Sequence, residues 1–256
     1  MSTPLTLEAY EQLNPRCELP CEGGSIVFAT PTAITRQRME VFFTKEPCTL
    51  DWIASFSRGD VLVDVGANVG TYSLWAAKTR GARVFAFEPE AQNFALLNRN
   101  IHLNRLQEQI TAYCAGVIDV SGWSELHLAQ FQPGGSCHSV GEEVDFNHQP
   151  KAAVYTQGCI TARLDDLVAQ GTLPQPQHIK IDVDGFEPKV IDGARAVIAD
   201  PRLRSFLIEV NQNLEDHRQM VKFLETQGFG WDRGQVARAE RKSGPFKGCA
   251  EYVFRR

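Results

Sequence analysis

Residues 61–72 read VLVDVGANVGTY, and the rest of the chain can be interpreted around them. A short, mostly β-branched run ends at a loop with two glycines, and the residues that follow change from a strand pattern to a helical one. We therefore expect a strand, a tight turn and a helix. Gly66 and Gly70 permit positive φ angles and let a ligand approach the backbone where no Cβ intervenes. Turns of this kind bind the nucleotide part of several cofactors.

Asp64 narrows the choice of cofactor. A dinucleotide would place its pyrophosphate over the turn and the positive end of the helix, where a carboxylate repels it. The spacing from Gly66 to Gly70 also lacks the three-glycine form of the dinucleotide fingerprint. S-adenosylmethionine carries an ammonium and a sulfonium but no phosphate, so it suits an acidic strand end better. An NAD-dependent oxidoreductase remains an alternative.

A second acidic residue supports this interpretation. Residues 83–89 read RVFAFEP, which predicts a second strand that ends at Glu88. Glu88 lies roughly 20 residues beyond the turn, the separation at which a carboxylate accepts both hydroxyls of an adenosine ribose. The glycine turn, Asp64 and Glu88 together predict an adenosine-containing cofactor.

Composition limits the organisation and the partners of the chain. Its 256 residues, 43% of them hydrophobic, suffice for one large α/β domain with a short extension. We expect residues 1–50 to be an N-terminal extension that packs on the core and residues 51–256 to be the domain that binds the cofactor. The net charge of −5 provides no basic surface for a phosphate backbone, so nucleic acid is not an expected partner.

Apolar runs and cysteines indicate where in the cell the protein is expected. No apolar run of about 18 residues predicts a membrane span. The seven cysteines are scattered and lack the paired spacing of a zinc site, which indicates reduced thiols in the cytoplasm. The oligomeric state is not predictable from the sequence.

Two later segments complete the expected cofactor region. A third strand is expected at residues 110–118, where Ala115 and Gly116 are small enough to lie against a flat base. Residues 133–141, PGGSCHSVG, are typical of a mobile loop that covers a substrate. His138 in this loop is a candidate base, although a histidine in a polar loop is often only solvated. His148 and His217 are weaker candidates.

Charged residues interrupt two apolar strands further along. In HIKIDVDGFEP, residues 178–188, Lys180 and Asp182 share one face of a strand, where they either pair with each other or line a crevice. Glu209 and Asn211 end the next strand. Ligands of doubly wound sheets bind beyond the carboxyl ends of the strands, so we expect these residues to converge on one crevice. Asp182, Glu209 and Asn211 offer the oxygen ligands that Mg²⁺ needs, which makes a metal-assisted reaction an alternative.

Taken in order, the motifs resemble the FkbM family of S-adenosylmethionine-dependent methyltransferases. The resemblance runs from about residue 59 to 211 and departs from the family's usual Glu at Asp184. It is carried by DVGANVGTYS at 64–73, FEP at 87–89 with Phe94, Leu97, Asn100 and Asn104, LDDL at 164–167, and IKIDVDGFE at 179–187.

This resemblance implies a class I methyltransferase fold, a Rossmann-like doubly wound α/β sheet of seven strands, mostly parallel with an antiparallel last strand. It also implies O-methylation of a hydroxyl on a sugar, a glycan or another small metabolite. Asp182 or His138 would accept the hydroxyl proton, and Lys180 would face the reacting centre with Asp182. By motif match the cofactor-binding residues are Asp64, Gly66, Asn68, Gly70 and Glu88, with Ala115 and Gly116 at the adenine. A cofactor-binding module without catalysis is a further alternative.

Overall fold

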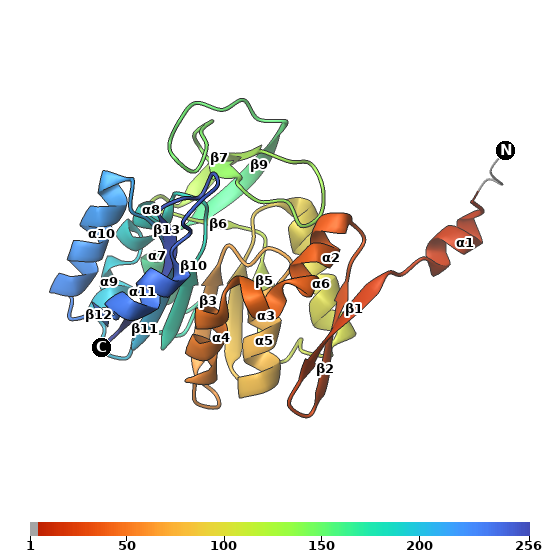
Figure 1. Ribbon diagram of the computed structural model, residues 1–256, viewed down its shortest axis with the longest axis horizontal. Helices are drawn as coiled ribbons and strands as arrows, with labels where there is room; N and C mark the ends of the chain where they lie inside the picture. The colour runs from red at the N-terminus through yellow and green to blue at the C-terminus, as the bar shows by residue number, and fades with distance from the viewer. Residues whose placement is uncertain (1–4) are drawn as a thin grey trace.

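The computed structural model describes residues 5–256 and shows an α/β protein built on a seven-stranded sheet (Figure 1). The strand order is β12-β13-β11-β10-β3-β4-β5. Strands β11, β10, β3, β4 and β5 are parallel, and β13 is antiparallel to both of its neighbours. The predicted doubly wound sheet with an antiparallel last strand is confirmed. The strands are β3 (Val61–Val65), β4 (Arg83–Phe87), β5 (Ile110–Tyr113), β10 (His178–Ile181), β11 (Ser205–Asn211), β12 (Gly230–Trp231) and β13 (Cys249–Arg255).

Helices cover both faces of this sheet because its strands are apolar on both sides. Strand β3 is buried along its whole length, so successive residues enter two different cores. Val63 packs in the core under α8, α9 and α10, whereas Leu62 packs in the core under α4, α5 and α6. The helices are α4 (Pro47–Ala54), α5 (Thr71–Arg80), α6 (Ala91–Leu103), α7 (Leu164–Ala169), α8 (Glu187–Asp192), α9 (Arg195–Ala199), α10 (Glu215–Thr226) and α11 (Arg233–Ala239).

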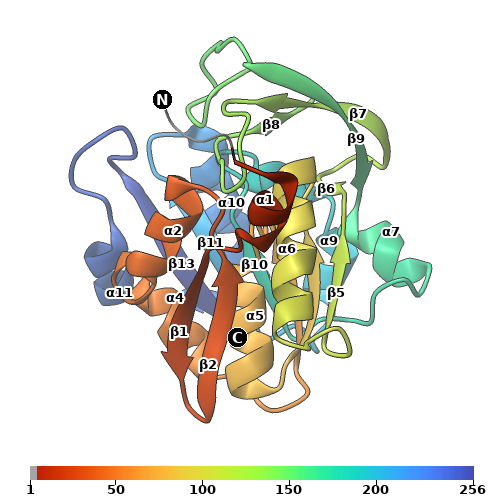
Figure 2. The same cartoon turned by 90° about the vertical axis from the view of Figure 1, so that its right-hand side faces the viewer.

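The predicted third strand is divided between two sheets. Residues of β5 stay in the main sheet, but β6 (Gly116–Val117) pairs in parallel with β9 (Tyr155–Ala162). Strand β9 also pairs with β7 (Gly122–Leu128), and β7 pairs with β8 (Ser139–Val140). This four-stranded sheet lies above the main sheet in both views (Figures 1 and 2).

Most of the N-terminal region lies against this body. Strands β1 (Arg16–Cys21) and β2 (Gly24–Ala29) form a hairpin, and helices α2 (Ala33–Glu40) and α3 (Phe42–Lys45) follow it. The side-chain oxygens of Asn100 in α6 and of Asn104, its C-cap, accept hydrogen bonds from backbone amides of β2, at 2.9 and 2.8 Å. Helix α1 (Leu7–Gln12) projects from the body (Figure 1). Residues 1–4 of the predicted extension lie outside the described residues, and the domain boundary near residue 50 stays a prediction.

Within residues 5–256, no helix combines the length and the apolar character needed to cross a membrane.

Candidate active site

The predicted turn between β3 and α5 has the backbone conformation that its glycines permit. The amides of Gly66 and Ala67 donate to the carbonyl of Phe87, at 3.0 and 2.9 Å, which closes the turn against β4. Gly66 has φ +79°, and a Cβ there would lie 1.9 Å from the carbonyl oxygen of Asp182. Gly70 has φ +85°, and its Cβ would meet the side chain of Leu97. Both positions therefore exclude larger residues.

A hollow of about 620 Å³, here called the turn cavity, opens beside this turn. Among the residues predicted to bind the cofactor, those that line the cavity are Gly66, Asn68, Glu88, Ala115 and Gly116. Apolar residues that include Val117, Leu126 and Val140 form much of the rest of the wall. Asp64 and Gly70 are not part of the lining.

Glu88 keeps a buried carboxylate at the edge of the turn cavity. Its Oε2 accepts from the backbone amide of Asn68 at 2.8 Å, and its Oε1 accepts from that of Glu90 at 2.9 Å. Burial raises the pKa of Glu88 to about 7 in spite of these bonds. Each carboxylate oxygen has a second lone pair, so the side chain can still accept hydrogen bonds from a ligand hydroxyl.

Asp64 lies beneath the turn instead of in the cavity. Its side chain is buried, with Oδ2 accepting from the hydroxyl of Ser73 at 2.6 Å and Oδ1 without a partner. Burial raises the pKa of Asp64, and the positive charge of Lys180 limits the rise. Asp64 and Lys180 are register partners in β3 and β10. The structure thus places Asp64 in a charge network with Lys180.

Lys180 and Asp182 form a pair, and Asp182 also reaches the surface of the site. Lys180 Nζ lies 3.0 Å from Asp182 Oδ2 and 5.4 Å from the ring centre of Tyr72. The Lys180 side chain is 2% exposed, whereas that of Asp182 is 32% exposed. Burial opposes ionisation of Asp182, but Lys180 and Lys45 hold its pKa well below the usual range. The sequence left open whether Lys180 and Asp182 pair with each other or line a crevice. In the structure they pair, and Asp182 also lines the turn cavity.

A second hollow of about 1140 Å³, here called the helix cavity, adjoins the first. Helices α2 and α3 supply Arg38 and Lys45 to its wall, and Arg241 and Phe246 enter from the C-terminal region. Five residues line both cavities and therefore mark their junction. They are Gly66, Asn68, Ser136, Asp182 and Asp184.

The carboxylate cluster beside this junction contains Asp184 in place of Asn211, which the sequence had suggested as a metal ligand. Ligand atoms of Asp182, Asp184 and Glu209 lie within 4.8 Å of one another. Asn211 is engaged elsewhere, because its Oδ1 accepts from the Asn213 amide at 3.1 Å and its Nδ2 donates to Asn147 at 3.0 Å. Burial and the charge of Asp182 raise the pKa of Glu209 to about 8, although Arg241 pairs with it.

The predicted loop at residues 133–141 is held in place over the turn cavity. The carbonyl of Gly135 accepts from the side-chain amides of Asn68 and Asn93, at 2.7 and 3.1 Å, and Asn93 accepts from the amide of Gly134 at 2.7 Å. His138 follows and also lines the cavity. Asn93 had not been singled out in the sequence, although it immediately precedes the motif residue Phe94.

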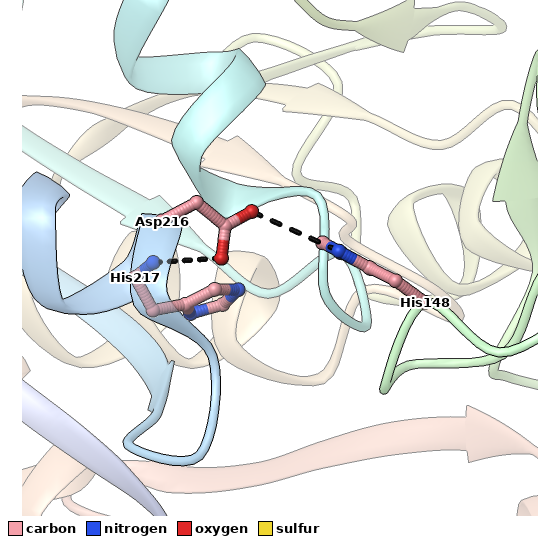
Figure 3. Close-up of side chains that lie close together, drawn as sticks. All are labelled: His148, Asp216 and His217. Atoms are coloured by element: carbon pink, nitrogen blue, oxygen red, sulfur yellow. Dashed lines mark hydrogen bonds and ion pairs between the residues drawn. The ribbon is translucent and has the colours of Figure 1, made fainter.

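His148, Asp216 and His217 form a second cluster, at the loop that follows β10 (Figure 3). Nε2 of His148 and Nε2 of His217 lie 2.9 and 3.1 Å from the carbonyl oxygen of Gly185, so both imidazoles donate to it. Nδ1 of His217 accepts from the backbone amide of Asn211 at 3.2 Å. His217 therefore has no lone pair for a metal, and the cluster supports the loop that carries Asp182 and Asp184.

The strand order, with its antiparallel last strand, is that of the class I methyltransferase fold. The family model described as the methyltransferase FkbM domain matches residues 64–230, and the chain belongs to this family.

Two relatives and one solved structure illustrate the similarity. The chain is 31% identical over 173 residues to the hexuronic acid methyltransferase of Haloferax volcanii, a match covering 64% of this chain and 61% of that one. It is 28% identical over 192 residues to the 31-O-demethyl-FK506 methyltransferase of Streptomyces tacrolimicus, covering 67% and 73%. A precorrin-6y C5,15-methyltransferase from Geobacter metallireducens has a TM-score of 0.49 at 16% identity, covering 90% of this chain and 93% of that one.

The fold implies S-adenosylmethionine as cofactor, and the residues present fit it. Gly66 lines the turn cavity, and the absence of a Cβ lets its backbone pack against the carbonyl of Asp182. Glu88, Ala115 and Gly116 also line the cavity, where the carboxylate could accept hydrogen bonds from ribose hydroxyls and the two small residues would leave room for a flat base.

Proposed function

We propose that this protein transfers a methyl group from S-adenosylmethionine to a hydroxyl of a sugar, a glycan or another small metabolite. One observation carries the proposal: Asp182 lines both the turn cavity and the helix cavity. A carboxylate at their junction stands where a cofactor in one cavity would meet an acceptor in the other. The proposed catalytic residue is therefore Asp182.

The cofactor would lie in the turn cavity against the Gly66 backbone, with Asn68 and Glu88 beside its ribose and Ala115 and Gly116 beside its adenine. When bound, it supplies a methyl group on a positively charged sulfur. Neither Asp64 nor Gly70 is proposed to touch it, because the first supports the turn through Ser73 and the second permits the close packing of Leu97.

Asp182 has the properties required to accept the hydroxyl proton. A neutral alcohol loses its proton as its oxygen forms the bond to carbon, and a carboxylate aligned with that oxygen both orients it and takes the proton. Lys180 binds Oδ2 of Asp182 and keeps the group ionised, which leaves Oδ1 for the acceptor. Lys180 itself is buried and is proposed as a positioning residue. His138 is less suited as a base because its Nδ1 already accepts a hydrogen bond from the backbone amide of Ala129, which leaves no free lone pair on the neutral ring.

The helix cavity favours an acceptor with several polar groups. Arg38, Lys45 and Gln37 offer donors, Asp184 and Glu209 offer acceptors, and Phe246 offers an aromatic face. A sugar presents hydroxyls that donate and accept, together with C–H faces that pack on aromatic rings. The two relatives are named for a hexuronic acid and for 31-O-demethyl-FK506, and these names support a hydroxylated small molecule as acceptor.

Magnesium is not part of the proposal. Lys180 and Arg241 already pair with Asp182 and Glu209, so the carboxylate cluster carries much of its compensating charge in its own side chains.

The test combines a cofactor assay with an acceptor screen. S-adenosylhomocysteine and NAD are titrated calorimetrically, and methyl transfer from labelled S-adenosylmethionine is measured on hexoses, hexuronic acids and hydroxylated macrolides. Asp182→Asn is expected to lower turnover by about 10²- to 10⁴-fold, the usual contribution of an acid–base group, while S-adenosylhomocysteine affinity changes little. Asp192→Asn, at an exposed ion pair with Arg195, is the matched control.

Three results would oppose the proposal. Full turnover in Asp182→Asn would remove the proposed base. Binding of NAD in place of S-adenosylhomocysteine would favour the oxidoreductase. Cofactor binding without methylation of any acceptor in the panel would favour a module that has lost catalysis.

A further inference from the structure

A third hollow, of about 1770 Å³ and here called the strand groove, runs along one face of β13. One wall comes from α3 and α4, and the other comes from β12 and α11, which lies beside α4 in both views (Figures 1 and 2). Alternate residues of β13 form the floor, because those between them face the opposite core. The floor residues are Glu251, Val253 and Arg255.

The strand groove adjoins the helix cavity. Lys45 lines both hollows. Glu251 lines the groove, and its register partner on β11, Glu209, lines the helix cavity. Arg241 pairs with both carboxylates, so the two hollows are one side chain apart on the same face of the sheet. An acceptor bound beside Asp182 in the helix cavity can therefore extend past Lys45 into the groove.

The groove contains polar groups that have no partner in the protein. The side chain of Glu251 is 7% exposed, and its Oε1 accepts from Arg241 at 2.8 Å. Its Oε2 makes no hydrogen bond within residues 5–256, yet it is not one of the unpaired atoms there that are sealed from solvent, so it is open to a ligand. Asp51 on α4 and Arg238 on α11 are exposed, and neither side chain has an ion pair or hydrogen bond in the described chain. The floor and both walls therefore offer free hydrogen-bonding groups.

The mixture of these groups favours a ligand rich in hydroxyls. Three basic and four acidic residues line the groove, so their formal charges nearly balance. A polyanion requires an excess of basic residues, and an apolar chain would desolvate the charges without replacing their hydrogen bonds to water. A sugar hydroxyl both donates to a carboxylate and accepts from a guanidinium or ammonium group, so a sugar satisfies both kinds of residue.

We propose that the acceptor is a chain of at least two sugar units, with the methylated unit in the helix cavity and its neighbours in the strand groove. The assignment rests on the proposed function, which places the reacting hydroxyl at Asp182, and it narrows the acceptor to a glycan. Asp51, Arg238 and Glu251 would bind the outer units. They have no part in the transfer of the methyl group or the proton, so they determine which chain length is preferred.

The dependence of methyl transfer on acceptor length tests this assignment. Initial rates are measured at saturating S-adenosylmethionine on members with one to four units of the cello-, manno-, chito- and oligogalacturonate series. The wild type is compared with Asp51→Ala and Arg238→Ala, which alter opposite walls of the groove. Arg233→Ala is the matched control, because Arg233 is an exposed arginine on the same helix as Arg238 and does not line the groove.

The expected pattern separates a binding subsite from a structural role. In one series, kcat/KM rises by at least about 10-fold between the monosaccharide and a longer member. Each groove variant raises KM for that longer member by about 5- to 20-fold, the cost of a lost hydrogen bond to a charged group, and leaves kcat within about twofold. The affinity for S-adenosylhomocysteine and the rate on the monosaccharide stay the same, whereas a folding defect would lower both. Arg233→Ala behaves as the wild type.

Contrary results have separate meanings. If a monosaccharide or a macrolide is methylated at least as efficiently as every longer saccharide, or if the groove variants leave KM for the longer acceptors unchanged, the assignment is wrong and the proposed function stands. If the groove variants instead change the molar mass of the protein in solution, the groove is an interface between copies of the chain and the assignment is again wrong. If no acceptor of any length is methylated, the proposed function is opposed and the assignment falls with it.

Discussion

Replacing Lys180 with methionine removes a positive charge from the interior of the sheet while it preserves the length of the side chain. Lys180 is 2% exposed, and its Nζ lies 3.0 Å from Asp182. Its register partner, Asp64, is 1% exposed and has no other basic side chain among the interactions that lower its pKa. The variant therefore leaves one fully buried carboxylate and one partly exposed carboxylate without their shared cation.

The expected loss of folding stability comes from the protonation of Asp64. Without Lys180 nothing cationic offsets its burial, so it takes up a proton when the chain folds. Protonating a carboxyl whose ordinary pKa is 3.8 costs about 4 kcal/mol at pH 7. This agrees with the 3–5 kcal/mol found, as a rough range, when one partner of a buried ion pair is removed. Asp182 keeps contact with water and adds less. We expect Lys180→Met to lower the free energy of unfolding by about 3–5 kcal/mol at pH 7.

The sign of the pH dependence distinguishes this cause from a packing defect. In the variant, native Asp64 holds a proton that the unfolded chain releases above pH 3.8, so stability falls as pH rises, by about 1.4 kcal/mol per unit. The deficit relative to the wild type should therefore shrink by about 2.7 kcal/mol between pH 7 and pH 5. Urea unfolding at pH 5, 6 and 7 measures it. Lys189→Met, which breaks a half-exposed pair with Glu142, is the control and should cost under about 1 kcal/mol. A Lys180→Met deficit that is small, or the same at all three pH values, would refute the reasoning.

Further experiments test the turn at Gly66, the hydrogen bonds of Asn93 with Gly134 and Gly135, and the need for a metal ion. In Gly66→Ala the new Cβ would lie 1.9 Å from the Asp182 carbonyl oxygen, so calorimetry should show S-adenosylhomocysteine binding weakened by more than about 10-fold. Gly158→Ala is the control, because no atom lies near its Cβ position, and its affinity should not change. Asn93→Ala removes the two hydrogen bonds that Asn93 makes with the backbone of Gly134 and Gly135. The variant should therefore release S-adenosylhomocysteine about 10-fold faster in stopped-flow fluorescence, and an unchanged rate would mean that these bonds do not control release. A chelator should change the methyl transfer rate by less than about twofold, since basic side chains already pair with the carboxylates, and restoration by Mg²⁺ would contradict this.

The sheet was predictable because its signals are local. The apolar run of β3 and the two glycines predict a strand and a turn without reference to other elements, and Gly66 occupies a position that only glycine tolerates. The position of Ala115 and Gly116 was also predictable, because the chain must cross the end of the sheet there. What the sequence did not indicate is that β5 ends at Tyr113 and that the next residues pair with β9, since that pairing depends on a partner about 45 residues away.

Side-chain direction was less predictable than strand position. Asn211 ends β11 at the expected edge, yet its amide is bonded to Asn213 and Asn147 instead of facing the carboxylates. Asp64 likewise lies near the expected end of β3, but it is buried beneath the turn beside its register partner Lys180 and does not line the cavity. A strand pattern specifies which end of the sheet a residue reaches and which face it shares. It does not specify which neighbour satisfies a polar group, because that neighbour comes from a distant element.

The division between the two cavities explains why the sequence indicated which cofactor binds but did not identify which hydroxyl compound is methylated. The residues that line the turn cavity fall between Val65 and Phe186, wholly inside the region matched by the family model. The helix cavity is different, because Arg38 and Lys45 precede residue 64 and Arg241 and Phe246 follow residue 230. The region matched by the family model therefore supplies the whole lining of the turn cavity, and the flanking segments supply much of the surface that the proposed acceptor would touch. It follows that exchanging residues 33–45 between relatives should alter which acceptor is methylated while leaving S-adenosylhomocysteine affinity nearly unchanged.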